Sequence, residues 1–282
     1  MLGKLIKNEF KAVNRLMIPL HLGLIAVTII GRFYLQFTVF NNPGRAVVMS
    51  DNIWFGLLNA TLIVFYILAL FAAALITGIY LEIIRFRKNL FTDEGYLMHT
   101  LPVTASAHIW SKLIVCLVWV IVDVILVVLS VFGLFVNMDI LRALPEGLSL
   151  MFSSFPDAFG VSAGLGIPLY FLLFLVDSVS GILVIYMCIA VGHSFNTHKI
   201  LSSVGIYVGV TMINSILGMI FSAITGMVAY TSMSLAVVAD GTVNGPAYFW
   251  MSWIFSMLLS LATGIISYLL ANYFMTKKLN LE

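Results

Sequence analysis

The chain has 282 residues, of which 62% are hydrophobic and only 9% are charged. Soluble globular domains carry about 25% charged residues, so a soluble protein of this composition would lack the polar surface needed to cover its core. The composition therefore excludes an ordinary soluble protein and indicates that a lipid bilayer surrounds most of the chain. The net charge of +2 gives no reason to expect a nucleic-acid partner.

Six apolar stretches are long enough to cross a membrane as helices, which takes about 20 mostly apolar residues. The sequence predicts these spans at residues 16–40, 53–80, 113–136, 165–191, 202–225 and 248–274. We therefore expect an all-α, polytopic membrane protein in which residues 1–282 form a single transmembrane domain.

The first 16 residues have a helical pattern of their own. Apolar residues recur every three or four positions, and basic and amide side chains occupy the remaining surface; the apolar set is Leu2, Leu5, Ile6, Phe10, Val13 and Leu16. This pattern predicts an interfacial helix over residues 1–16 that lies in the headgroup plane. A plain extension of the first span is the alternative.

The basic residues are distributed unequally between the two sides of the membrane. If the N-terminus is cytoplasmic, 11 of the 14 basic residues fall on the cytoplasmic side, and only Arg32, Arg45 and Arg142 fall toward the other. An excess of Lys and Arg marks cytoplasmic loops. We therefore expect both termini to be cytoplasmic.

The fifth apolar stretch, residues 202–238, is too long for one span. As one helix its 37 residues would be roughly 55 Å long, whereas the hydrocarbon core is about 30 Å thick. Glycine and hydroxyl residues loosen its second half. We predict a span that ends near Thr225, a break between Ser222 and Tyr230, and a re-entrant or irregular segment up to residues 240–247 before the last span.

The longest connection on the outer side covers residues 137–163. Pro145 and Pro156 are expected to break it. At most, residues 141–152 are expected to form a short helix on the outer surface.

Three charged residues fall inside predicted spans: Arg32, Asp123 and Asp177. A carboxylate at the centre of a membrane costs several kcal/mol unless it is paired, protonated or hydrated. The two Asp residues are therefore interpreted either as a polar clamp between helices, with Asn59 or Asn214 as partners, or as part of a proton or substrate pathway.

Small residues in the fifth stretch predict close helix packing. Gly205 and Gly209 form one four-residue step, and Gly218, Ser222 and Gly226 form a second series on the opposite face. One face would meet a neighbouring helix, and the other a second protomer. Packing within one chain is the simpler alternative.

The sequence lacks the common motifs of catalysis. It has no G-x-x-x-x-G-K-[ST] phosphate loop and no H-E-x-x-H metal motif. His193 and His198 are interpreted as polar interface residues rather than metal ligands, because no carboxylate is near them in the sequence. We expect no catalytic residue, no metal site and no enzyme activity in this chain.

The segment from 83 to 112 is too long for a simple turn between two spans. Asp93 favours a helix start through its attraction to the helix dipole, and Pro102 stops the helix. A short helix that carries Tyr96 and Leu97 is therefore predicted beneath the membrane. It would be either a docking surface for a soluble partner or a connector resting on the membrane.

This segment resembles the first cytoplasmic loop of ABC type-2 permeases from Gram-positive bacteria. The pieces that carry the resemblance occur in the family's order: Glu94-Gly95-Tyr96-Leu97, Leu101-Pro102-Val103 and Ser111-Lys112. The runs KNEFK at 7–11 and KKLNLE at 277–282 are similar to the same family, and the similarity in topology covers the whole chain.

The resemblance implies the permease of an exporter with two permeases and two ABC ATPase subunits, in a bacterial cytoplasmic membrane. ATP and Mg would bind the ATPase, this chain would bind no cofactor, and the second permease would be the same or a related chain. The cargo would be peptides, antibiotics or other amphipathic molecules, and membrane lipid would surround the spans. The coupling residues would be Arg87, Asp93, Glu94, Gly95, Tyr96, Leu97, Met98, Leu101 and Pro102.

The residues leave open one alternative of another class. A proton-coupled secondary transporter would use Asp123 and Asp177 as proton carriers. In that case transport would need no ATPase.

Overall fold

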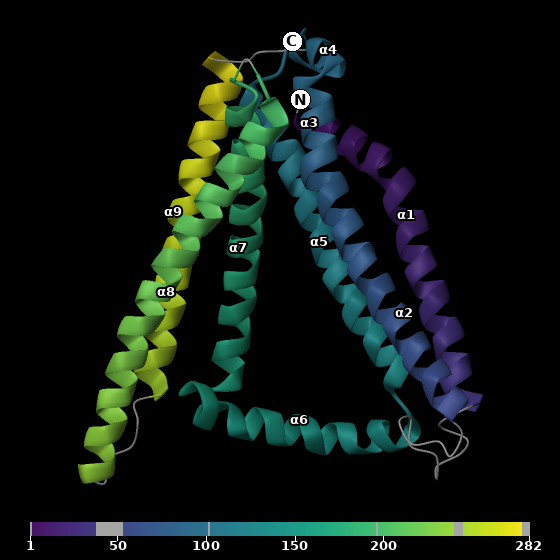
Figure 1. Ribbon diagram of the computed structural model, residues 1–282, viewed down its shortest axis with the longest axis vertical. Coiled ribbons are helices and arrows are strands. Elements are labelled where there is room, and N and C mark those ends of the chain that lie inside the picture. Colours follow the sequence, from purple (N-terminus) through teal and green to yellow (C-terminus); the bar gives the residue numbers. More distant parts are fainter. Residues whose placement is uncertain (1, 38–52, 101, 196, 240–244, 278–282) are drawn as a thin grey trace. The chain divides into compact units, whose positions relative to one another are not determined.

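In the computed structural model, which describes residues 2–37, 53–100, 102–195, 197–239 and 245–277, the chain is all-helical, with no strand among these residues (Figure 1). The elements in chain order are α1 (Leu2–Leu35), α2 (Ile53–Gly78), the π-helix η2 (Ile79–Ile84), α3 (Arg85–Phe91), α4 (Asp93–Thr100), α5 (Ala105–Phe135), α6 (Met138–Phe159), α7 (Ala163–Gly192), α8 (Lys199–Ala239) and α9 (Gly245–Lys277).

Six helical segments are long and apolar enough to cross a membrane, which confirms the predicted all-α class and the six candidate spans. They are Leu2–Leu35, Gly56–Phe91, Ala105–Phe135, Ala163–Gly192, Lys199–Met227 and Phe249–Lys277. In a six-span arrangement, α4 and the connection from α7 to α8 lie on one side of the membrane, and α6 lies on the opposite side.

The chain divides into two compact units. Unit 1 contains residues 1–86 and 110–144, and unit 2 contains residues 87–109 and 145–282. Helices α1 and α2 and most of α5 belong to unit 1, whereas α4, α7, α8 and α9 belong to unit 2.

In unit 1, α1 and α5 lie side by side in the same direction. Hydrogen bonds join His21 to Asp123, Thr28 to Ser130 and Arg32 to the carbonyl of Leu134, always with a sequence separation of 102 residues. A constant separation means that the two helices keep one register along their length. Helix α2 runs the opposite way, because Glu9 contacts Arg85 near one end and Tyr34 contacts Asn59 near the other.

In unit 2, α7 is packed against both α8 and α9. The indole Nε1 of Trp253 in α9 donates to the carbonyl oxygen of Leu169 in α7 at 3.0 Å. Phe221 of α8 stacks on Phe255 of α9, with ring centroids 3.9 Å apart. The second half of α7 contains most of the buried residues of this helix, among them Tyr186.

The predicted interfacial helix over residues 1–16 is not a separate element. α1 is continuous for 34 residues, or about 51 Å at ~1.5 Å per residue. This exceeds the hydrocarbon thickness of about 30 Å, so part of α1 must extend beyond the core or tilt. The continuous helix matches the alternative interpretation, in which residues 1–16 extend the first span.

The predicted break between Ser222 and Tyr230 is wrong. α8 continues without interruption for 41 residues. The hydroxyl of Thr225 donates to the carbonyl oxygens of Phe221 and Ser222 at 2.9 and 3.3 Å, so the polar side chain is satisfied within the helix and gives no cause for a break. Of the predicted irregular segment, residues 226–239 belong to α8, residues 240–244 lie outside the described residues, and residues 245–247 begin α9.

The prediction that Pro145 and Pro156 break the connection between the third and fourth spans is wrong. Both lie inside the 22-residue helix α6. Each proline loses only its own N–H hydrogen bond, and both are exposed, so the carbonyl four residues earlier can be solvated instead.

The close approach of α7 and α8 predicts a sharp difference between two glycines of α7. A Cβ at Gly192 would lie 2.0 Å from Ser203 Oγ and 2.7 Å from its backbone nitrogen, whereas a Cβ at Gly181 meets nothing within 4 Å. Gly192→Ala is expected to lower the free energy of unfolding by about 1–3 kcal/mol, since backbone cannot yield as a side chain does. Thermal unfolding in detergent measures this.

Gly181→Ala is the matched control and should leave the melting temperature unchanged or raise it, because alanine favours the helix by about 1 kcal/mol over glycine. Equal melting temperatures for the two variants would contradict the close packing of α7 on α8.

Candidate functional site

A cluster of three charges joins the helices of unit 1 at the end where α1 begins. Glu9 Oε1 accepts from the Arg85 guanidinium at 2.9 Å and from Lys112 Nζ at 3.0 Å. These side chains are between 5% and 19% exposed, so the two cations and one carboxylate are largely removed from water. Breaking such a buried pair costs about 3–5 kcal/mol, because one charge is left uncompensated.

Further along the same pair of helices, His21 and Asp123 form a buried pair. His21 Nε2 lies 3.1 Å from Asp123 Oδ1, and the side chains are 5% and 11% exposed. The imidazole ring also packs on Trp119, with centroids 5.1 Å apart. The partners predicted for the intramembrane carboxylates, Asn59 and Asn214, are therefore wrong for Asp123.

The hydrogen bonds of His21 determine how many protons the pair holds. Nδ1 lies 2.7 Å from the carbonyl oxygen of Met17, which can only accept, so Nδ1 carries a proton. The contact with Asp123 then needs one more proton, on either Nε2 or the carboxyl group. In both forms the pair is neutral overall, which lowers the cost of placing a carboxyl group at this depth.

Two further polar contacts complete this seam, by which we mean the line of polar contacts between α1 and α5. Thr28 Oγ1 donates to the carbonyl of Leu24 and lies 2.6 Å from Ser130 Oγ, which also contacts the hydroxyl of Tyr66. Arg32 donates to the carbonyl oxygen of Leu134 at 3.3 Å. The predicted intramembrane Arg32 is thus held by backbone at the far end of the seam.

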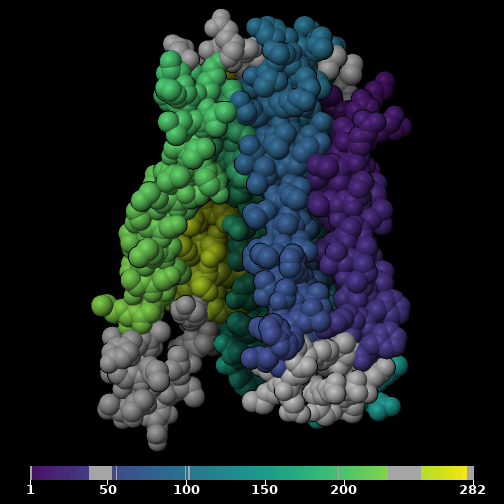
Figure 2. Space-filling model, turned by 45° about the vertical axis from the view of Figure 1, so that its right-hand side comes forward, coloured from purple at the N-terminus to yellow at the C-terminus, as the bar shows by residue number. Residues whose placement is uncertain are grey.

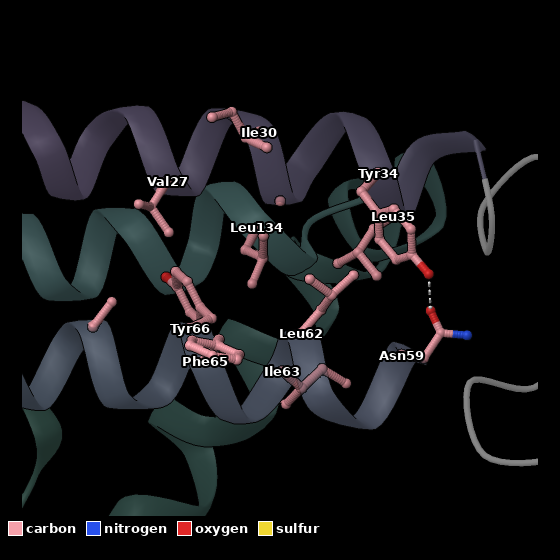
Figure 3. Close-up of a pocket in the computed structure, with 12 residues that line it drawn as sticks. Val27, Ile30, Tyr34, Leu35, Asn59, Leu62, Ile63, Phe65, Tyr66 and Leu134 are labelled. Carbon is pink, nitrogen blue, oxygen red and sulfur yellow. Dashed lines mark hydrogen bonds between the residues drawn. The ribbon is translucent and has the colours of Figure 1, made fainter. Parts of the chain in front are cut away.

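Unit 1 contains an apolar cavity of about 330 Å³ between α1, α2 and the end of α5 (Figure 3). Val27, Ile30 and Leu62 are among its walls, and the Tyr34 hydroxyl donates to Asn59 Oδ1 at 2.8 Å at one end. Apolar walls with a few polar groups are typical of sites for small molecules. The cavity therefore suits the apolar part of an amphipathic molecule.

Asp177 lies in unit 2, where Ser260 of α9 donates to its Oδ1 at 3.0 Å. The two residues, with Tyr170 and Ser256, line a small cavity of about 360 Å³, and Asp177 is exposed to it rather than buried. The clamp between helices is thus formed with a serine. Asn214, one of the predicted partners, instead accepts from Thr263 at 3.4 Å.

The short helix α4 lies where the sequence predicts one, between Asp93 and Pro102. Tyr96 and Leu97 are 55% and 74% exposed, Met98 is half-buried, and Gly95 is buried. The other predicted coupling residues are exposed or half-buried, apart from Leu101, which lies outside the described residues; these are Arg87, Asp93, Glu94 and Pro102. An ion pair at 3.3 Å joins Glu94 to Lys88.

The helix that leads into α4 is held to the end of α7 by His193. The ring of Phe91 in α3 packs on the imidazole with centroids 4.8 Å apart, and Arg87 Nε donates to His193 Nε2 at 3.4 Å. His193 Nδ1 donates to the carbonyl of Ile189 at 2.8 Å. His193 therefore acts as a polar interface residue, as predicted, and joins α3 to α7.

Burial lowers the pKa of His193, and the nearby charges of Arg87 and Lys199 lower it further, although the hydrogen bond to Ile189 acts in the opposite direction. The ring is consequently neutral at pH 7. Protonation of Nε2 would remove the acceptor that Arg87 now uses and place two positive charges together.

The glycines of α8 have open space where neighbouring helices were predicted. A Cβ at Gly205, Gly209, Gly218 or Gly226 would meet nothing within 4 Å. In the view of Figure 2, no other helix lies over the part of α8 that is drawn in green. Contact of one of these faces with a neighbouring helix and of the other with a second protomer stays a prediction.

The sequence analysis identified Asp123 and Asp177 but missed two residues that pair with charged side chains in unit 1. The two carboxyl groups belong to different units, so they are not brought into one site within either unit. The residues missed as pairing partners are His21, which contacts Asp123, and Glu9, which contacts Arg85 and Lys112.

The described residues contain no group of three His, Cys, Asp or Glu side chains that could hold a metal ion. Comparison with family models, with curated proteins and with solved structures finds no match for this chain. The functional assignment therefore depends on the residues and their geometry.

Because Asp123 contacts His21, we expect the stability of the protein to depend more on the hydrogen-bonding ability of side chain 123 than on its charge. In Asp123→Asn, the amide can still donate to Nε2. In Asp123→Leu, Nε2 is left buried without a partner, which costs about 1–3 kcal/mol. We expect a clear loss of thermal stability in detergent for the Leu variant and little loss for the Asn variant.

Asp177→Leu is the matched control, because it removes an exposed carboxylate and should cost less. If Asp123→Leu were as stable as Asp123→Asn, the hydrogen bond between His21 and Asp123 would contribute nothing to the stability of the protein.

The lowered pKa of His193 predicts a pH dependence of stability. The unfolded state binds its proton near pH 6.5, before the folded state does, so stability decreases as pH falls below about 6.5 and is retained above it. His193→Gln should flatten this part of the curve of melting temperature against pH, measured from about pH 7.5 to 5.

His198→Asn is the matched control, since His198 is an exposed histidine five residues away. Its curve should match that of the unmodified protein. A His193→Gln curve with an unchanged slope would show that His193 is not the group responsible.

Proposed function

We propose that this chain is the membrane-spanning permease subunit of an ATP-driven exporter of the ABC type-2 class. The observation that carries the proposal is α4, an eight-residue helix between two candidate spans that exposes large apolar side chains. The loop motif around Glu94-Gly95-Tyr96-Leu97, which resembles that family, covers the same helix.

α4 has only eight residues, and a helix of this length is not stable alone in water. Its exposed apolar side chains therefore point to a contact with a partner. Tyr96 and Leu97 point away from their own unit, whereas Gly95 is buried against it. A groove on a soluble partner that received these two side chains would bury them. An ATPase subunit is the partner that the family resemblance implies.

A route from α4 into the membrane is available within unit 2. α4 follows α3 after one residue, and α3 is joined to the end of α7 through Phe91, Arg87 and His193. Movement of α4 would therefore be passed to α7. The ATP-bound ATPase would act as a ligand of the permease. It would shift the conformational equilibrium of the permease by binding its two states with different affinity.

The apolar cavity of unit 1 supports an amphipathic cargo. Its walls are hydrophobic, and the hydroxyl of Tyr34 and the amide of Asn59 lie at one end. Peptides or antibiotics with one apolar and one polar part match this lining. The open glycine face of α8 supports a partnership with a second permease, identical or related, because small residues let helices approach closely.

The charge distribution supports the orientation. With both termini cytoplasmic, α4 lies in the cytoplasm beside Arg87 and Lys88, where an ATPase can reach it. The proposed location is the cytoplasmic membrane of a bacterium, with ATP and Mg bound by the partner and not by this chain.

A second function is favoured by the pair formed by His21 and Asp123. A buried imidazole and carboxyl group that share one proton are suited to proton-coupled transport. Asn14 Oδ1 and Trp119 Nε1, which are buried without a partner among the described residues, belong to the same two helices and offer sites for water. In such a carrier Asp123→Asn would abolish transport, whereas an exporter driven by ATP would retain it.

The coupling hypothesis predicts the effect of removing the two exposed side chains of α4. A few central side chains dominate interfaces of this kind, each worth about 2 kcal/mol, or roughly thirtyfold in affinity. Tyr96→Ala with Leu97→Ala should therefore leave the permease folded but strongly reduce its co-purification with an ABC ATPase that binds the unmodified permease. ATP hydrolysis should also become uncoupled from transport.

Phe195→Ala with Leu201→Ala is the matched control, because both residues are exposed apolar groups at the same membrane side, 49% and 69% accessible. It should retain the ATPase. If the α4 double variant binds its ATPase and transports as well as this control does, α4 is only a connector and the exporter assignment fails.

A further inference from the structure

Helix α6 is strongly amphipathic. At about 100° per residue, eight of its ten large apolar side chains fall within one third of the circumference, and its charged and hydroxyl side chains lie mostly on the opposite side. Met138 and Leu150 are the two exceptions and lie on the polar side. The apolar face consists of Ile140, Leu141, Leu144, Leu148, Met151, Phe152, Phe155 and Phe159. The polar face consists of Asp139, Arg142, Glu146, Ser149, Ser153 and Asp157.

Within unit 2, the apolar face of α6 is exposed along most of its length. α6 contains no buried residue, and Leu148, Met151 and Phe152 are 44%, 46% and 47% exposed. Aromatic and aliphatic groups exposed together on one helix indicate a contact that lies outside the protein.

Short connections hold both ends of α6 at the membrane surface. Residues 136–137 separate it from α5, and residues 160–162 separate it from α7. Asn137 caps its start, since the side-chain Oδ1 accepts from the N–H of Ile140 at 2.8 Å, and Gly160 ends it with a φ of 71°. Two or three extended residues reach only about 7–11 Å, so α6 cannot leave the ends of the two spans.

The direction of the apolar face follows from its contacts with α7. The ring of Phe155 contacts Gly166, where a Cβ would lie 2.5 Å from Phe155 Cε1, and the ring of Phe159 lies edge-on to Tyr170 at 6.1 Å. Gly166 and Tyr170 are one and two turns inside α7, which begins at Ala163. The apolar face therefore looks along α7 toward the membrane interior.

The part of α6 in unit 2 runs across the direction of α7, not beside it (Figure 1). A helix with this orientation lies parallel to the membrane surface if α7 crosses the membrane. With its side chains a helix is about 10–12 Å across, so its lower side reaches the boundary between headgroups and acyl chains.

We propose that α6 is a membrane-surface helix whose apolar face binds the acyl-chain boundary of the leaflet opposite to α4. Phospholipid is the partner because the face points into the membrane, while the acidic polar face, with three carboxylates and one arginine, is turned toward water and headgroups. Binding is driven by the burial of apolar area and not by attraction to anionic lipids, which the carboxylates would disfavour.

The experiment uses the full chain in liposomes with a nitroxide attached to single cysteines. Leu148→Cys and Phe152→Cys report on the apolar face, and Ser149→Cys and Ser153→Cys are the matched controls on the polar face. Power saturation should give greater collision with oxygen than with a water-soluble nickel complex at positions 148 and 152, and the reverse at positions 149 and 153. The contrast should be the same in zwitterionic and anionic vesicles.

Two results would overturn the proposal. Collision with the nickel complex at all four positions would place α6 in water, away from the lipid. Low collision with both reagents at positions 148 and 152 would show that protein, such as a second copy of the chain, covers the face. Since Cys116 and Cys188 are buried, the unmodified chain treated with the same label gives the background. Met151→Cys replaces either apolar-face variant that does not fold.

Discussion

Hydrocarbon offers no hydrogen bonds, so polar groups inside a membrane must find their partners within the protein. The seam between α1 and α5 meets this requirement in unit 1, where Glu9, His21, Thr28 and Arg32 each contact a group on α5 or its neighbours. Each contact is possible only if the helices keep one register. The pairing of polar groups therefore fixes how α1 and α5 lie against each other, and the apolar surfaces follow.

The same constraint explains the position of the cavity in unit 1. Where α1 passes α5 closely, small residues are needed, and a Cβ at Gly31 would lie 2.8 Å from Leu134 Cδ1. Beyond this point the polar contacts move to α2, where Tyr34 meets Asn59. Space remains between the helices there, and it is lined by side chains that suit an apolar guest.

Helices α4 and α6, for which different partners are proposed, differ in length and in the pattern of their apolar residues. α4 is short and is connected through α3 to His193. In the proposed function, a partner that binds Tyr96 and Leu97 would therefore act on α7 through this connection. α6 is long and has one continuous apolar face, which suits lipid better than a specific groove. The proposed docking surface and the proposed lipid surface thus differ in length, pattern and attachment, and these differences follow from the sequence of each segment.

The helical class, the six candidate spans and the short helix from Asp93 could be predicted from the sequence, because they depend on local composition and on prolines or acidic residues at helix ends. It gave the wrong break in α8 and the wrong effect of Pro145 and Pro156, since hydroxyl groups and single prolines are tolerated where their neighbours or solvent satisfy the backbone. Only the tertiary structure decided which residues pair, as with His21 and Asp123. A contact between residues 102 positions apart depends on the register of two helices, and no local pattern encodes that register.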